Sequence, residues 1–151
     1  MLRSRSGERE HYARFMPERQ VLVERTDVSV MFKRVADEQV AISRAMADLE
    51  KAIGSLRGRK FYGAFDTDGS EYRVCVELRD GDEADALGLE VGTLPGGRYA
   101  RVRLIGEPPD VYRLIGPTFE RLAERSDRDR DRPGIEFYRS RDVIDLLLPV
   151  L

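Results

Sequence analysis

The chain has 151 residues, of which 41% are hydrophobic and 36% are charged, and its formal net charge at pH 7 is −2. This length fits a single domain with one core, and the near balance of charge argues against direct nucleic-acid binding, which usually needs a basic excess. The single cysteine excludes an internal disulfide and a zinc cluster, and the single histidine excludes a multi-histidine metal site. No metal or cofactor is therefore expected.

No apolar run approaches the roughly 18 residues of a membrane span, and no hydrophobic segment follows the basic N-terminus. We therefore expect a cytoplasmic protein without membrane contact. Residues 1–19 form a polar leader that is either flexible or a short helix, and residues 20–151 form the domain.

The first half begins with alternating apolar and polar side chains in residues 21–35, which predict two short strands or one bent strand. A helix is predicted to follow, with Asp37 as its N-cap and Gly58 as its stop signal. It would run to about Leu56, because apolar side chains recur on one face at helical spacing: Ile42, Ala45, Met46, Leu49, Ile53 and Leu56.

A hairpin is predicted next, from two strand-like segments at residues 60–66 and 71–78. Thr67-Asp68-Gly69-Ser70 joins them, and Asp-Gly in this position is a strong hairpin signal. Side chains alternate along the second strand. One face would carry Tyr72, Val74, Val76 and Leu78, and the other Arg73, Cys75 and Glu77.

The second half repeats the order of the first. Two strands, a helix and two strands are predicted over residues 89–94, 98–106, 110–126, 134–139 and 142–150. Gly116-Pro117 either kinks this helix or marks the start of its main part, since proline is tolerated in the first helical turn. The charge run at residues 127–132 is expected to be a solvated loop.

These elements predict an α+β fold of duplicated strand-helix-strand-strand halves, each preceded by one further strand. Both helices would cover one face of an antiparallel sheet, and a central cleft would lie on the other face. We expect Glu136, Tyr138, Tyr99, Arg101 and Cys75 to point into that cleft, because each alternates with apolar neighbours assigned to the helix side. Cys75 is expected to be a small buried side chain, because no histidine is available to activate it.

The segments LPGGRYARVRLIG (94–106) and RPGIEFY with DLLLPV (132–150) resemble, in motif and order, the GyrI-like effector-binding domain family. That resemblance covers about residues 20–151. It implies a cleft that binds lipophilic, often cationic compounds, with Glu136 as the pocket acid and Tyr138 and Tyr99 as pocket tyrosines. Arg101 stands where the family usually carries an apolar residue, and a pair with Glu136 would cancel the countercharge.

Three functions follow from these residues and the resemblance. The first is a single-domain protein, monomer or homodimer, that senses or sequesters a hydrophobic compound, with or without a positive charge. The second is a hydrolase of electrophilic, cyclopropane-type molecules, in which Glu136 activates water and Tyr99 donates a proton. The third is an inhibitor module that binds a topoisomerase-like protein.

Overall fold

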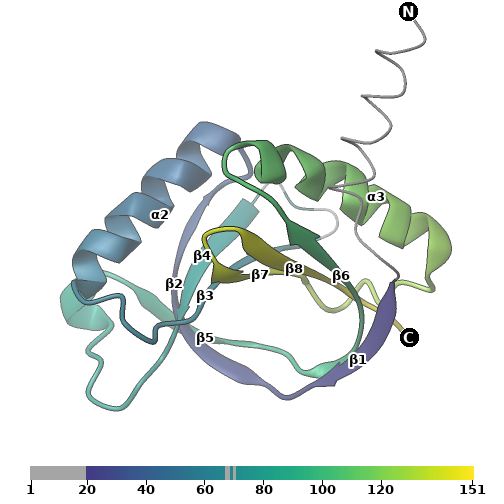
Figure 1. Cartoon of the computed structure of the whole chain (residues 1–151). Coiled ribbons are helices and arrows are strands. Elements are labelled where there is room, and N and C mark those ends of the chain that lie inside the picture. Colours follow the sequence, from purple (N-terminus) through teal and green to yellow (C-terminus); the bar gives the residue numbers. More distant parts are fainter. Residues whose placement is uncertain (1–19, 67–68, 70) are drawn as a thin grey trace, which may run out of the picture.

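The computed structural model describes residues 20–66, 69 and 71–151, and in this part of the chain eight strands form one curled antiparallel sheet with two α-helices packed against it (Figure 1). The first half contains β1 (Val21–Arg25), β2 (Val28–Ala36), α2 (Gln39–Ile53), β3 (Phe61–Phe65) and β4 (Glu71–Glu77). The 3-10 helix η1 (Asp85–Leu87) leads to the second half. That half contains β5 (Glu90–Leu94), β6 (Gly97–Ile105), η2 (Asp110–Leu114), α3 (Ile115–Arg125), β7 (Gly134–Ser140) and β8 (Val143–Pro149).

The sheet confirms the predicted duplication. Its strand order is β1-β6-β8-β7-β3-β4-β2-β5, and exchanging the corresponding strands of the two halves gives the same order in reverse. The halves therefore meet at the antiparallel β3–β7 pair in the middle. Each half also gives its first strand to the other half, because β1 pairs with β6 and β5 pairs with β2.

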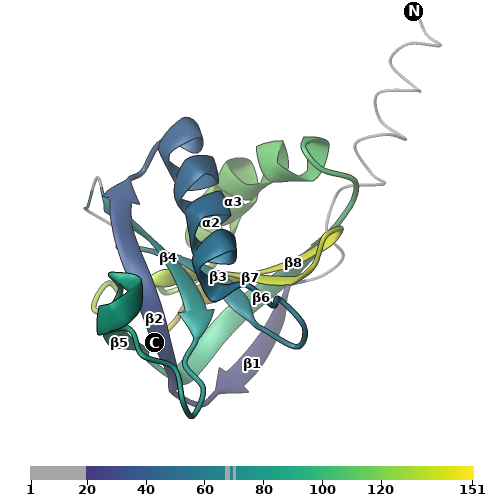
Figure 2. The ribbon, with the colours of Figure 1, turned by 90° about the vertical axis from the view of Figure 1, so that its left-hand side faces the viewer.

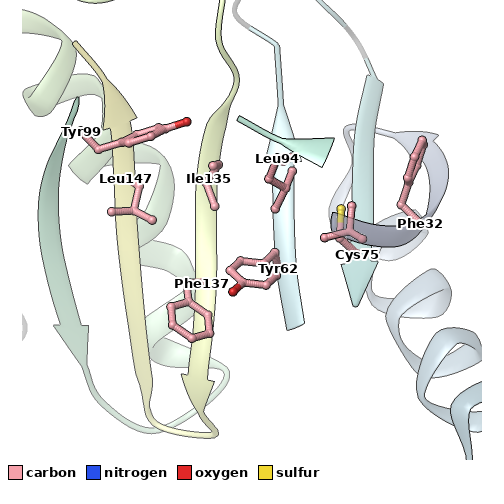
Figure 3. Packing of buried hydrophobic residues seen from close by; sticks show 10 residues of the cluster. Phe32, Tyr62, Cys75, Leu94, Tyr99, Ile135, Phe137 and Leu147 are labelled. Carbon is pink, nitrogen blue, oxygen red and sulfur yellow. The ribbon is translucent and has the colours of Figure 1, made fainter. Parts of the chain in front are cut away.

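Apolar clusters pack on both faces of the sheet, because the sheet curls around one face and the helices cover the middle of the other. Figure 2 shows α2 and α3 on the same side of the sheet, as the helical patterns predict. The helix side holds two apolar clusters, one under each helix. The opposite, concave side is filled by side chains from seven strands, and Figure 3 shows most of them: Val30, Phe32, Tyr62, Ala64, Cys75, Leu94, Tyr99, Ile135, Phe137 and Leu147.

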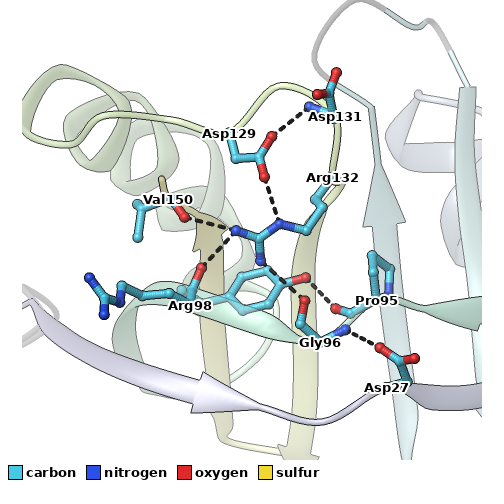
Figure 4. Close-up of polar contacts among 9 residues, drawn as sticks. Asp27, Pro95, Gly96, Arg98, Asp129, Asp131, Arg132 and Val150 are labelled. Atoms are coloured by element: carbon cyan, nitrogen blue, oxygen red, sulfur yellow. Dashed lines mark hydrogen bonds and ion pairs between the residues drawn. The ribbon is translucent and has the colours of Figure 1, made fainter.

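Arg132 holds the start of β7 to the ends of neighbouring strands (Figure 4). Its guanidinium donates to the backbone carbonyls of Gly96, Arg98 and Val150 and is paired with Asp129 at 2.8 Å. It also lies 4.9 Å from the centre of the Tyr99 ring. The prediction of a solvated loop for residues 127–132 is wrong at this position, because the Arg132 side chain is only 17% exposed.

The predicted elements agree with the structure except at their ends. Residues 21–35 form two strands, and α2 ends at Ile53 rather than at about Leu56, with Gly54 (φ 79°) instead of Gly58 as its C-cap. The 3-10 helix η2 precedes α3, so Pro117 lies in the first turn of α3. The leader 1–19 and three residues of the predicted hairpin turn, 67, 68 and 70, lie outside the described residues.

Candidate functional site

A cavity of about 940 Å³ lies between α2, α3 and the middle of the sheet. Ile42 and Met46 of α2 and Ile115 and Phe119 of α3 form its apolar walls, and Glu136 of β7 lies in its lining from the sheet. The predicted position of the cleft, on the face away from the helices, is therefore wrong. The concave face is filled by the core, so the space for a ligand lies on the helix side.

The registers of β7 explain why Glu136 points toward the helices. Ile135 and Phe137, its neighbours on either side, belong to the concave core, so alternation turns Glu136 to the other face. There it stands beside Leu146 of β8, which packs in the cluster under α3, and opposite Gly63 of β3. Glu136 thus occupies the central strand pair at the junction of the two halves.

Two phenols donate to one oxygen of Glu136. Tyr72 Oη lies 2.7 Å and Tyr138 Oη lies 2.5 Å from Glu136 Oε1, and the two phenol oxygens are 3.4 Å apart. Glu136 is only 6% exposed. Among the described residues no side chain donates to Oε2, and this oxygen is not one of the buried atoms without a partner, so it remains open to the cavity.

Gly63 makes the contact between Tyr72 and Glu136 possible. The Tyr72 side chain crosses over Gly63 to reach Glu136, and a methyl group on Gly63 would lie 1.6 Å from Tyr72 Oη and 2.4 Å from Tyr72 Cζ. Gly134 is similar, because the Phe65 ring occupies the space that a side chain at this position would need. Two glycines on the central strands therefore admit two aromatic rings from neighbouring positions.

Burial raises the pKa of Glu136, and the hydrogen bonds from Tyr138 and Tyr72 lower it only in part. The pKa values of both phenols lie well above the usual range, first because of burial and then because of the nearby Glu136 carboxylate. No lysine or arginine of the described chain compensates the Glu136 charge. The cavity thus contains a carboxyl group with two proton donors and no cationic partner.

Two arginines at the cavity are already paired. Arg59 donates to both carboxylate oxygens of Asp82, at 2.7 and 2.8 Å, and holds the pKa of Asp82 at about 2. Arg139 and Arg103 both donate to the buried Asp145. Arg59 and Arg139 are therefore not free to neutralise Glu136.

A family model for the GyrI-like small molecule binding domain matches residues 14–151. The chain belongs to this family. The match spans both halves of the duplicated fold and includes every residue that lines the cavity.

Solved structures share the fold of this GyrI-like domain. An integron cassette protein from the mobile metagenome of Vibrio cholerae has a TM-score of 0.71 and 17% identity, covering 91% of this chain and 97% of that protein. SAV2435, solved with tetraphenylphosphonium bound, has a TM-score of 0.60 and 11% identity over 89% of this chain and 94% of its own. A hydrolase from Listeria innocua has a TM-score of 0.55 and 11% identity over 95% and 98%. The search of curated proteins found no match.

The structure divides the predicted site residues of the GyrI-like domain between the two faces of the sheet. It brings Glu136 and Tyr138 together in the cavity. Tyr99 and Cys75 lie in the concave core, and Tyr99 donates to the Pro95 carbonyl at 2.5 Å. The prediction that these residues share a face with Glu136 is wrong, because the concave face is filled by apolar side chains rather than open to a ligand.

Arg101 also lies away from Glu136, opposite Leu147 of the concave core. Its Nε is buried and has no hydrogen-bond partner in residues 20–66, 69 and 71–151, and no ion pair joins it to Glu136. The question that the sequence left open is thereby answered, because Arg101 does not cancel the Glu136 charge.

Sequence reasoning missed Tyr72 as a site residue. It placed Tyr72 correctly on the helix face of its strand, but as part of the apolar core. The usable signal was Gly63 in the partner strand, since a glycine in a strand interior often marks a close approach by another group.

In the described part of the chain no group of histidine, cysteine, aspartate or glutamate side chains could hold a metal ion. No helix there is long and apolar enough to cross a membrane.

Proposed function

We propose that this GyrI-like domain binds a hydrophobic organic cation in the cavity between α2 and α3, with Glu136 as the countercharge, and thereby senses or sequesters that compound. The observation that carries the proposal is the buried Glu136 carboxylate, which lines the cavity and has two phenol donors but, within the described chain, no cationic partner. Removing a carboxylate from water costs several kcal/mol unless it is paired, so an incoming cation would restore a missing interaction.

The walls support the same class of ligand. Ile42, Met46, Ile115 and Phe119 offer apolar surface on both helices, and Phe65 adds a ring on the sheet side. Aromatic and apolar walls around the buried Glu136 carboxylate favour a lipophilic cation over a small hydrated one, because the ion must leave water to enter. Tetraphenylphosphonium, present in the SAV2435 structure, is a probe of this class.

The test compares tetraphenylphosphonium with tetraphenylborate, an anion of the same shape, by isothermal titration calorimetry. We expect wild type to bind the cation and not the anion. Glu136→Gln keeps the acceptor for both phenols but removes the charge, so it should weaken cation binding by about tenfold or more, which is about 1.4 kcal/mol. Glu120→Gln, at an exposed carboxylate of the same cavity, is the matched control and should change affinity less than about twofold. Equal cation affinity in wild type and Glu136→Gln would remove Glu136 from the proposal.

A second candidate function is hydrolysis of an electrophilic cyclopropane, and the contact between Glu136 and Tyr138 favours it. Glu136 would take a proton from water as the new C–O bond forms and the ring C–C bond breaks, and a phenol would protonate the released carbon. Tyr138 or Tyr72 would have to serve as this acid, because Tyr99 faces the concave core.

Product formation separates the two functions. An excess of a cyclopropane activated by two carbonyl groups would be incubated with the protein and the ring-opened alcohol measured by mass spectrometry. Many turnovers that are lost in Glu136→Gln would favour the hydrolase. Binding without product would favour the binding protein.

A further inference from the structure

Another charged side chain, Arg128, lines the same cavity just after the end of α3. Its Nε and Nη2 atoms are buried and have no hydrogen-bond partner among the residues that the structure describes. This distinguishes it from Arg59 and Arg139, which are bound to Asp82 and Asp145. The predicted solvated loop is therefore wrong at Arg128 as well, because this residue is half-buried at the cavity wall.

The charge of Arg128 is uncompensated. Burial lowers the pKa of its guanidinium, and the neighbouring Arg130 lowers it further, while no carboxylate acts to raise it. An arginine remains charged at neutral pH even so. Buried guanidinium donors without a partner cost the protein free energy, and the guanidinium attracts the opposite charge.

The two charges lie at different places along the cavity. Glu136 is opposite Leu146 of β8, whereas Arg128 forms a backbone bridge with Val150, four residues further along the chain. At the rise of a strand these positions are about 13 Å apart. Phe65 lies between them over Gly134, with its ring edge-to-face with Phe119 at 4.8 Å.

We propose that Arg128 forms a second subsite for an anionic group, so that the ligand is amphoteric: a cation beside Glu136, an aromatic body against Phe65 and Phe119, and a carboxylate or similar acid at Arg128. The inference rests on the proposed function and names its ligand class more closely. The Arg128 side chain can turn its donors toward such a group without losing any existing hydrogen bond. Guanidinium groups bind carboxylates through two parallel hydrogen bonds, which fixes the orientation of the ligand.

Two rhodamine dyes that differ at one group test the subsite by fluorescence anisotropy. Tetramethylrhodamine methyl ester carries the cation alone, and tetramethylrhodamine free acid carries the cation and a carboxylate. Arg128→Met should weaken binding of the free acid by about tenfold or more and leave the ester within about twofold. Arg128→Lys should retain most of the affinity for the free acid, and Arg130→Met, at an exposed neighbour, is the control and should change neither dye. Thermal unfolding would establish that each variant is folded.

The outcomes separate this inference from the function on which it rests. If Arg128→Met changes both dyes equally, or changes neither, the anionic subsite is overturned while binding of the ester through Glu136 still stands. If wild type does not bind the ester, or Glu136→Gln binds it equally well, the proposed function itself fails. A selective loss of the free acid in Arg128→Met supports both.

Discussion

Gly63→Ala tests how the site is built without replacing any of its functional side chains. The added methyl group would lie 1.6 Å from Tyr72 Oη and 2.4 Å from Tyr72 Cζ, so Tyr72 has to move away from Glu136. The backbone of Gly63 has no left-handed conformation, so the effect comes from this collision and not from backbone strain.

The expected loss has two parts. Breaking the 2.7 Å hydrogen bond from Tyr72 to the Glu136 carboxylate costs about 1.5–3 kcal/mol, and forcing a fully buried ring out of its place costs about 1–3 kcal/mol. Replacing glycine by alanine in a strand raises the free energy of unfolding by about 0.5–1 kcal/mol, which offsets part of this loss. The free energy of unfolding should therefore fall by about 2–5 kcal/mol.

Urea unfolding followed by circular dichroism measures this change, and Gly116→Ala is the matched control. Gly116 lies in α3, and nothing is within 4 Å of the position its methyl group would take, so this variant should keep or slightly gain stability. Tetraphenylphosphonium binding by Gly63→Ala should also weaken, because Glu136 loses one of the phenols that orient it. Equal stability of the two variants would refute the proposed packing of Tyr72 over Gly63.

Two further predictions concern protonation and stability. Tetraphenylphosphonium has a charge that does not titrate, so its affinity should fall as pH is lowered through the pKa of Glu136, which burial raises above its usual range. Tyr138→Phe removes a hydrogen bond that lowers this pKa, so in that variant the loss of affinity should occur at higher pH. An affinity that stays constant from pH about 8 to about 4 would contradict this. Arg132→Met leaves three backbone carbonyls without their donor, so the free energy of unfolding measured by urea titration should fall by about 3 kcal/mol. Arg130→Met, at an exposed residue, is the control and should change it by less than about 0.5 kcal/mol. Similar losses in both variants would argue against the role of Arg132.

The sequence predicted the duplicated α+β fold because each element carries its own local pattern. Alternation located the strands, helical spacing located α2, and the repeated order of elements indicated two halves. It also placed Glu136 and Tyr138 on one face of β7, which the structure confirms by bringing both into the cavity.

Alternation could not show which face of each strand meets the helices. The apolar pair Ile135 and Phe137 was assigned to the helix side, yet the curled sheet buries its concave face as well, and these two residues fill that face. The curvature of the sheet comes from pairing between strands that are distant in sequence, such as β1 with β6, and the sequence of β7 alone does not indicate it. For the same reason Tyr99 and Cys75 were predicted to face a ligand when they face the core.

The long-range partners of single side chains were equally hidden. Arg128 and Arg132 lie in a charge run whose composition predicts a solvent-exposed loop. In the structure the backbone of Arg128 and the side chain of Arg132 both contact Val150, just after the end of β8. Tyr72 reaches Glu136 across a gap that depends on Gly63 in another strand. Such contacts depend on register and on space, which composition does not record.

The location of the bound cation is the most direct test of the proposed site. Tetraphenylarsonium has the shape and charge of tetraphenylphosphonium, and its arsenic atom can be located by anomalous diffraction in crystals of the complex. We expect one arsenic peak between α2 and α3, beside the free Oε2 of Glu136. A peak on the concave face near Tyr99, or one outside the cavity, would contradict the account.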